Sequence, residues 1–165
     1  MSTATLSSMP AATTAVPRGL GWMSIARLGL VQAAIGAVVV LMTSTLNRIM
    51  VVELGLAAAV PGFLVGIHFA VQVLRPRMGF GSDRDGRRIR WIVGGMALTS
   101  VAGLLAAVAT AWMVTSTLAG FSVALLAFFL LGVGISASST PFLAYMAERV
   151  EEHRMAGAAA LTWIL

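Results

Sequence analysis

The sequence of 165 residues is 59% hydrophobic and only 10% charged. Globular domains are about half apolar and about a quarter charged, so these few charges could not cover a water-soluble fold. The formal charge of +5 reflects eleven basic residues, all arginine, that lie between apolar runs, which indicates membrane topology and not nucleic-acid binding. Cysteine is absent, which excludes disulfides, thiolate metal sites and a cysteine nucleophile.

Residues 1–24 predict a flexible segment in the cytoplasm. The residues are mostly small or polar, and Pro10 and Pro17 interrupt them. A signal peptide would show an early positive stretch followed by an apolar core, and neither is present. A transmembrane helical domain is therefore expected over residues 25–165.

Four apolar stretches are long enough to cross a bilayer, which takes about 20 residues. Pro61 suits the first turn of the second span, where the missing N–H of proline costs nothing, and Arg75, Pro76 and Arg77 are expected to end that span. The predicted fold is an all-α membrane protein, with spans at about 28–52, 57–74, 91–114 and 118–147.

Residues 155–165 form a further apolar segment that reaches only about half-way across a hydrocarbon core. We interpret it as the start of a fifth span in a longer chain, with a segment lying flat at the interface as the alternative. Ten arginines fall on one side of the predicted spans and Arg48 alone on the other. The positive-inside rule then places the N-terminus in the cytoplasm.

The loop between the second and third predicted spans carries the most specific local pattern, G-x-x-x-D-R-x-G-R-R. Gly79 allows close helix approach, Asp83 can cap a helix or hold an arginine, and Gly86 supplies a positive-φ turn. The arginines suit lipid headgroups. This pattern resembles the signature loop of the major facilitator superfamily, the alternative being an ordinary loop rich in glycine and arginine. Its residues are Gly79, Asp83, Arg84, Gly86, Arg87 and Arg88.

A closer resemblance extends over about residues 25–165. The runs LVQAAIGAVVVLMTSTLNRIMVVEL, GIHFAVQVLRPRMGFGSDRDGRR and WIVGGMAL are similar to the PucC and LhaA family, the bacteriochlorophyll delivery branch of that superfamily. The resemblance implies a factor that assembles light-harvesting complexes in a bacterial photosynthetic inner membrane. It also implies bacteriochlorophyll as a possible cofactor and antenna or reaction-centre polypeptides as partners. Family members have about twelve spans, so this chain would supply only the N-terminal third.

Polar residues inside a span are costly in lipid and are candidates for function. His68 lies in the middle of the second span with Gln72 one turn later, and a neutral imidazole could ligate the magnesium of a chlorin. The alternative for His68 is a hydrogen bond between helices. Gln32, near the cytoplasmic end of the first span, could contact a pigment carbonyl or, as we favour, a neighbouring helix.

Arg48 and Glu53 are expected to anchor the outer end of the first span at the headgroups, with a gating role as the alternative. Because they are five positions apart and lie on different faces of a helix, a direct ion pair would require the helix to end between them. Small residues recur at four-residue spacing and predict close helix packing, or a flat face for an antenna helix or a chlorin ring. These rows are Gly29, Ala33 and Ala37; Gly62, Gly66 and Ala70; and Gly132, Ser136 and Thr140.

The sequence predicts no catalytic residues and no metal site. A prenyl-transferring chlorophyll synthase would need aspartate clusters for magnesium diphosphate, yet the only close pair, Asp83 and Asp85, belongs to the loop motif. His153 lies in a charged loop. Two other functions stay open: a proton-coupled solute exporter, which needs a carboxylate buried in a span, and a structural subunit of an antenna or reaction-centre complex.

Overall fold

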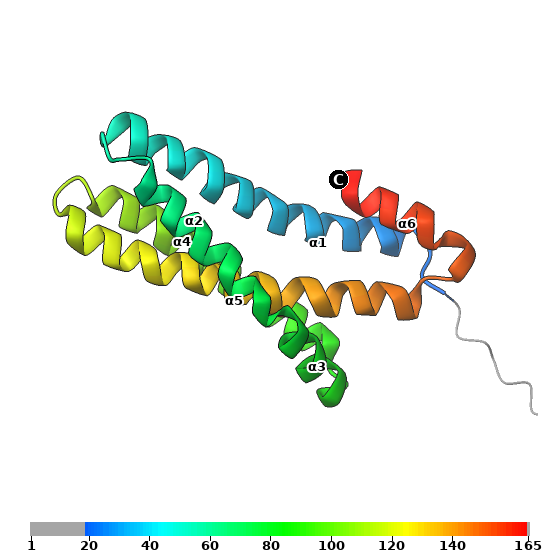
Figure 1. Cartoon of the computed structure of the whole chain (residues 1–165). Helices are drawn as coiled ribbons and strands as arrows, with labels where there is room; N and C mark the ends of the chain where they lie inside the picture. The colour runs from blue at the N-terminus through cyan, green and yellow to red at the C-terminus, as the bar shows by residue number, and fades with distance from the viewer. Residues whose placement is uncertain (1–18, 165) are drawn as a thin grey trace, which may run out of the picture.

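The computed structural model describes residues 19–164, and the expectations for residues 1–18 lie outside this part of the chain. The regular elements in the described range are all helical (Figure 1). Helix α1 begins at Trp22, so residues 22–24, which were expected to be flexible, are helical. The α-helices are α1 Trp22–Val40, α2 Ala59–Val71, α3 Arg75–Asp85, α4 Arg88–Trp112, α5 Thr117–Arg149 and α6 Glu152–Ile164.

Four continuous helices are long and apolar enough to cross a membrane, which confirms the predicted all-α membrane fold. The first is 32 residues long because the π-helical segments Leu41–Leu46 and Ile49–Glu53 extend α1. The shorter α6 corresponds to the expected start of a fifth span. The long helices are Trp22–Glu53, Ala59–Asp85, Arg88–Trp112 and Thr117–Arg149.

The second long helix does not end at Arg75, Pro76 and Arg77, so that expectation is wrong. A single 3₁₀ turn, Gln72–Leu74, joins α2 to α3, and helical structure continues to Asp85. Pro76 falls in the first turn of α3, where its missing N–H breaks no helical hydrogen bond. The rule that allows Pro61 at the start of α2 therefore also allows a proline at this internal restart.

Helix α5 is the central element of the bundle: α2, α3 and α4 all pack on it, while α6 packs beside the start of α1 (Figure 1). Buried side chains form one cluster around Met42, Leu64 and Phe128 and a second around Ile25 and Phe142. The second cluster joins α1, α5 and α6 at the end of the bundle where α5 ends. We call this end the arginine-rich end, because α3, the start of α4 and the end of α5 bring Arg84, Arg87, Arg88, Arg90 and Arg149 there.

The rows of small residues have different surroundings. The row on α5 packs closely: a Cβ at Gly132 would lie 2.7 Å from the His68 carbonyl oxygen, and the Thr140 side chain faces Gly79. The row on α2 faces open space in the described part of the chain, because nothing lies within 4 Å of a Cβ at Gly62 or Gly66. Close packing is thus found for the α5 row and not for the α2 row.

Candidate functional site

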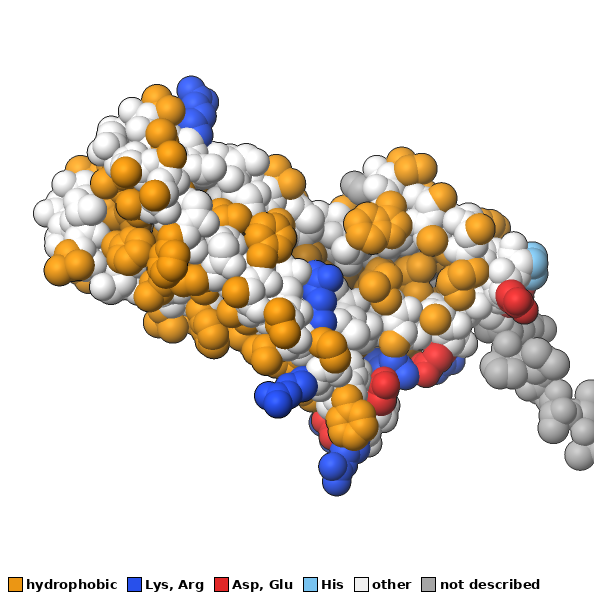
Figure 2. Space-filling view, in the orientation of Figure 1, with side chains coloured by type: hydrophobic (Ala, Val, Ile, Leu, Met, Phe, Trp, Pro, Cys, Tyr) orange, Lys and Arg blue, Asp and Glu red, His pale blue; other side chains and the backbone are white. Residues whose placement is uncertain are grey.

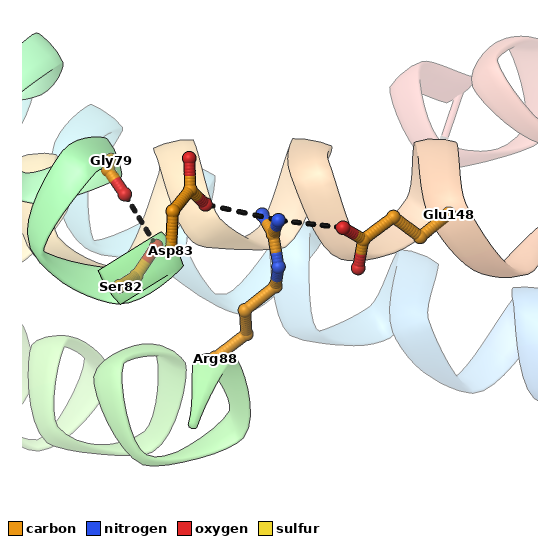
Figure 3. A network of polar contacts seen from close by, with 5 residues as sticks. All are labelled: Gly79, Ser82, Asp83, Arg88 and Glu148. Atoms are coloured by element: carbon orange, nitrogen blue, oxygen red, sulfur yellow. Dashed lines mark hydrogen bonds and ion pairs between the residues drawn. The ribbon is translucent and has the colours of Figure 1, made fainter. Parts of the chain in front are cut away.

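The motif between α3 and α4 forms an ion-pair network at the arginine-rich end (Figure 3). Arg88, the first residue of α4, places its Nη2 atom 2.9 Å from the Asp83 carboxylate and 2.6 Å from the Glu148 carboxylate of α5. The Arg88 side chain is 17% exposed, and its Nη1 atom is buried without a hydrogen-bond partner in the described structure. One guanidinium therefore ties together the ends of three helices.

The other motif residues shape the chain around this network. A Cβ at Gly79 would lie 2.9 Å from the Thr140 methyl group, and the Ser82 hydroxyl donates a hydrogen bond to the Gly79 carbonyl oxygen at 2.8 Å. Gly86 has φ +62°, the positive-φ conformation expected of this glycine, and it ends α3. Arg84 and Arg87 are exposed. The motif thus brings α3 close to α5 and turns the chain into α4.

Substituting Gly86 tests this turn. Alanine at Gly86 is expected to destabilise the chain by about 1 kcal/mol, because a left-handed conformation strains any residue with a Cβ. Asparagine tolerates this conformation better, so Gly86→Asn should retain more stability. Thermal unfolding in detergent, followed by circular dichroism, measures both variants. In the part of the chain that the structure describes, nothing lies within 4 Å of a Cβ at Gly86, so the strained conformation is the expected cause of any loss. Equal melting temperatures for wild type and Gly86→Ala would contradict the role of this turn.

Gln32 lies in a different place, on α1 beside a groove of about 560 Å³ that reaches α6. Small residues of α1, namely Ala33, Gly36 and Ala37, line the groove, and Trp163 of α6 lines it as well. The Gln32 Oε1 atom is buried and has no hydrogen-bond partner among the described residues. A buried amide oxygen without a partner carries a desolvation cost that a bound group could relieve.

A smaller cavity of about 120 Å³ adjoins this groove and shares Gln32, Thr162 and Trp163 with it. Arg75 and Ser139 add hydrogen-bond donors to its lining, and Phe142 and Leu143 add apolar surface. Polar groups of α1, α3 and α5 therefore converge beside a largely apolar groove, a combination typical of small-molecule sites. We call the groove and cavity together the Gln32 groove.

His68 is fully buried where α2 packs on α5 and does not line the Gln32 groove. Its Nε2 atom lies 2.9 Å from the Gln72 Nε2 atom, so the amide N–H of Gln72 donates to the imidazole. The Nδ1 atom is buried without a partner in the described chain. Ligation of a pigment magnesium by His68 stays a prediction, and ligation through the Nε2 atom would require this atom to exchange Gln72 for the metal.

Arg48 and Glu53 are exposed at the end of the first long helix, opposite the arginine-rich end. The helix runs through both residues and does not end between them, because its π-helical part includes Glu53. Among residues 19–164 no ion pair joins their side chains. This geometry is compatible with separate headgroup anchors.

Several residues at these sites were missed by the sequence interpretation. Glu148 lies one residue beyond the predicted fourth span, 118–147, and was given no role, although it completes the Arg88 network from 60 residues away. Arg75 was read only as a helix stop, although it lines the small cavity with Ser139. A carboxylate at the end of the fourth predicted span, on the same side of the membrane as the arginines of the loop motif, is the sequence signal that could have pointed to Glu148.

Four bilayer-length helices, three of which are joined at one end by Arg88 and two carboxylates, define a multi-pass helical membrane protein. The family model described as PUCC protein matches residues 45–165. The chain belongs to this family.

Curated relatives support the same family. The chain is 47% identical over 146 residues to the bacteriochlorophyll synthase 44.5 kDa chain of Rhodobacter capsulatus, covering 88% of this chain and 34% of that protein. It is 32% identical to the protein PucC of Rhodobacter capsulatus, covering 84% of this chain and 33% of that protein. The chain thus spans about a third of the length of these relatives. No solved structure is significantly similar to it.

Proposed function

We propose that this chain is an accessory factor in the assembly of bacterial light-harvesting complexes and that it binds bacteriochlorophyll in the Gln32 groove. Membership of the PUCC protein family supports a role in photosynthesis, as does similarity to a relative named as a bacteriochlorophyll synthase chain. In the proposed topology the N-terminus and the arginine-rich end face the cytoplasm, and antenna or reaction-centre polypeptides are the partners. The chain spans about a third of the length of its relatives, so the activity and partners proposed here are those of the whole protein.

The observation that carries this proposal is the buried Oε1 atom of Gln32, which has no hydrogen-bond partner within residues 19–164. Magnesium prefers oxygen ligands, and the carbonyl oxygen of an amide is one of them. The groove beside Gln32 has a floor of small residues, Ala33, Gly36 and Ala37, that a flat ring can approach, and Trp163 adds an aromatic surface. Gln32 would hold the magnesium of the pigment, and Arg75 and Ser139 could donate hydrogen bonds to pigment carbonyl groups. Bound pigment would supply light absorption to the complex that receives it.

A catalytic role receives less support. Magnesium diphosphate chemistry needs free carboxylates, whereas Asp83 pairs with Arg88 and Asp85 accepts a hydrogen bond from the Trp91 indole N–H at 3.2 Å. The exporter alternative needs a titratable carboxylate within a span. All six acidic residues lie instead at helix ends or in the adjoining turns, which favours a binding function over proton coupling.

Pigment binding by variants tests the proposal. The purified chain in detergent is titrated with bacteriochlorophyll, and the bound pigment is measured by absorption after separation from free pigment. Gln32→Leu is expected to weaken binding roughly tenfold, because one coordination bond is lost without a change in side-chain size. Gln72→Leu is the matched control, since it removes a glutamine amide outside the groove, and it should bind like the wild type.

Three outcomes distinguish the alternatives. No pigment binding by the wild type would overturn the proposal, as would unchanged binding by Gln32→Leu. Loss of pigment binding in His68→Leu, with normal binding in Gln32→Leu, would show that His68 and not Gln32 ligates the pigment. In cells, deletion of the gene should lower antenna absorption, and normal antenna levels would refute the assembly role.

A further inference from the structure

A second cavity, of about 470 Å³, lies at the arginine-rich end and is separate from the Gln32 groove. It is formed where the end of α3, the start of α4 and the end of α5 meet, beside the Arg88 network. In Figure 2 most of the charged side chains gather around α3 and below α5, while hydrophobic side chains are spread over the long helices. The cavity therefore lies at the boundary between the bilayer-length apolar surface and the charged surface.

The lining of this cavity carries an excess of positive charge. Four arginines and two carboxylates line it, which gives a net charge of +2. The carboxylates of Asp83 and Glu148 are already paired with Arg88. Arg87, Arg90 and Arg149 are exposed and have no carboxylate within ion-pair distance in the described structure. An anion is the ligand that this arrangement favours.

Backbone and side-chain donors reinforce this preference. Helix α4 begins at the cavity, and no side chain caps its N-terminus. The first N–H groups of a helix lack intrahelical partners and carry partial positive charge, so they attract phosphate oxygens. The Arg149 guanidinium lies 5.7 Å from the centre of the Tyr145 ring, which holds it at the cavity wall. Within the described residues, the cavity thus combines three guanidinium groups that have no ion-pair partner with a helix start that no side chain caps.

We propose that this cavity binds the phosphate of an anionic phospholipid headgroup. The site lies at the ends of membrane-crossing helices, where headgroup phosphates are concentrated, and arginine pairs strongly with phosphate. Ile89, also in the lining, is 60% exposed and provides apolar contact next to the charged groups. Free phosphate shares the anionic chemistry but has no acyl chain to use this surface. The bound lipid would steady the turn between α3 and α4, and this proposal does not depend on pigment binding.

Lipid binding by matched variants tests the proposal. The full chain in a neutral detergent is titrated with phosphatidylglycerol, and bound lipid is counted by native mass spectrometry. Phosphatidylcholine with the same acyl chains is the control lipid, and inorganic phosphate alone is the control anion. The double variant Arg87→Gln, Arg90→Gln is compared with Arg77→Gln, Arg84→Gln, which removes the same charge from exposed positions outside the cavity.

The cavity variant is expected to bind phosphatidylglycerol at least roughly tenfold more weakly, since each arginine near a headgroup contributes about fivefold. The control variant should lose less than about twofold. Arg87→Lys, Arg90→Lys should retain most of the affinity, which excludes misfolding as the cause. An equal loss of phosphatidylglycerol affinity in both glutamine double variants would overturn the proposal. So would a wild-type affinity for phosphatidylcholine equal to that for phosphatidylglycerol. Binding of inorganic phosphate as tight as that of phosphatidylglycerol would assign the cavity to free phosphate and overturn the lipid assignment.

Discussion

Alanine at Gly95 is expected to destabilise the chain by about 2 kcal/mol, whereas alanine at the neighbouring Gly94 should cost almost nothing. A Cβ at Gly95 would lie 2.6 Å from the Ser138 backbone nitrogen and 2.7 Å from the Gly134 carbonyl oxygen. Both atoms belong to the backbone of α5, so rotation of a side chain cannot relieve the overlap. The α4–α5 interface would have to open along its length, with loss of close packing throughout.

Gly94 and Gly95 are adjacent in one helix, so comparing their alanine variants isolates the effect of the contact with α5. No atom of the described residues lies within 4 Å of a Cβ at Gly94, so Gly94→Ala changes helix propensity without changing these contacts. Unfolding of detergent-solubilised chains by sodium dodecyl sulfate, followed by circular dichroism, gives the free energy difference. Similar losses for both variants would show that α4 and α5 do not approach as closely as the structure has them.

Glutamine at Arg88 is expected to lower the free energy of unfolding by about 1–2 kcal/mol. The substitution leaves the carboxylates of Asp83 and Glu148 without the cation that both of them contact. The carboxylates are 57% and 54% exposed, so solvent screens their repulsion and keeps the loss moderate. The same unfolding assay measures the loss, which should shrink as the salt concentration rises.

Arg87→Gln provides the control, because Arg87 is an exposed neighbour outside the ion-pair network, and its loss should stay below about 0.5 kcal/mol. The double variant Arg88→Gln, Glu148→Gln should lose less free energy of unfolding than the sum of the losses in the two single variants, because each single substitution removes the same ion pair. Additive losses would mean that Arg88 and Glu148 do not interact in the membrane-like environment.

The local features of the chain were predictable because each depends on neighbouring residues. The length of the apolar runs predicts four helices, and the structure contains them. The positive φ of Gly86 follows from its place after a polar helix end, where glycine adopts this conformation most readily. The helix boundaries were less accurate: the restart of the helix at Arg75 depends on a 3₁₀ turn that no residue type signals by itself.

Contacts between residues far apart in the chain could not be predicted from the sequence in the same way. In a water-soluble helix the polar face marks the surface, but lipid-facing and protein-facing residues of a membrane helix are both apolar. Periodicity therefore does not reveal how each helix is rotated about its axis. For this reason the row of small residues on α5 and the one on α2 look alike in sequence, although only the α5 row packs against another helix.

The sequence alone determined that the chain is a helical membrane protein, how many long helices it has and which helix ends carry the arginines, since hydrophobic length and charge act locally. Only the tertiary structure decided that Arg88 pairs with Glu148 and that Gln72 donates a hydrogen bond to the Nε2 atom of His68. It also decided that Gln32 lines a groove and that its Oε1 atom has no hydrogen-bond partner among the described residues. Those outcomes depend on helix rotation and on backbone approach at glycines such as Gly95, and these are properties of packed pairs of helices.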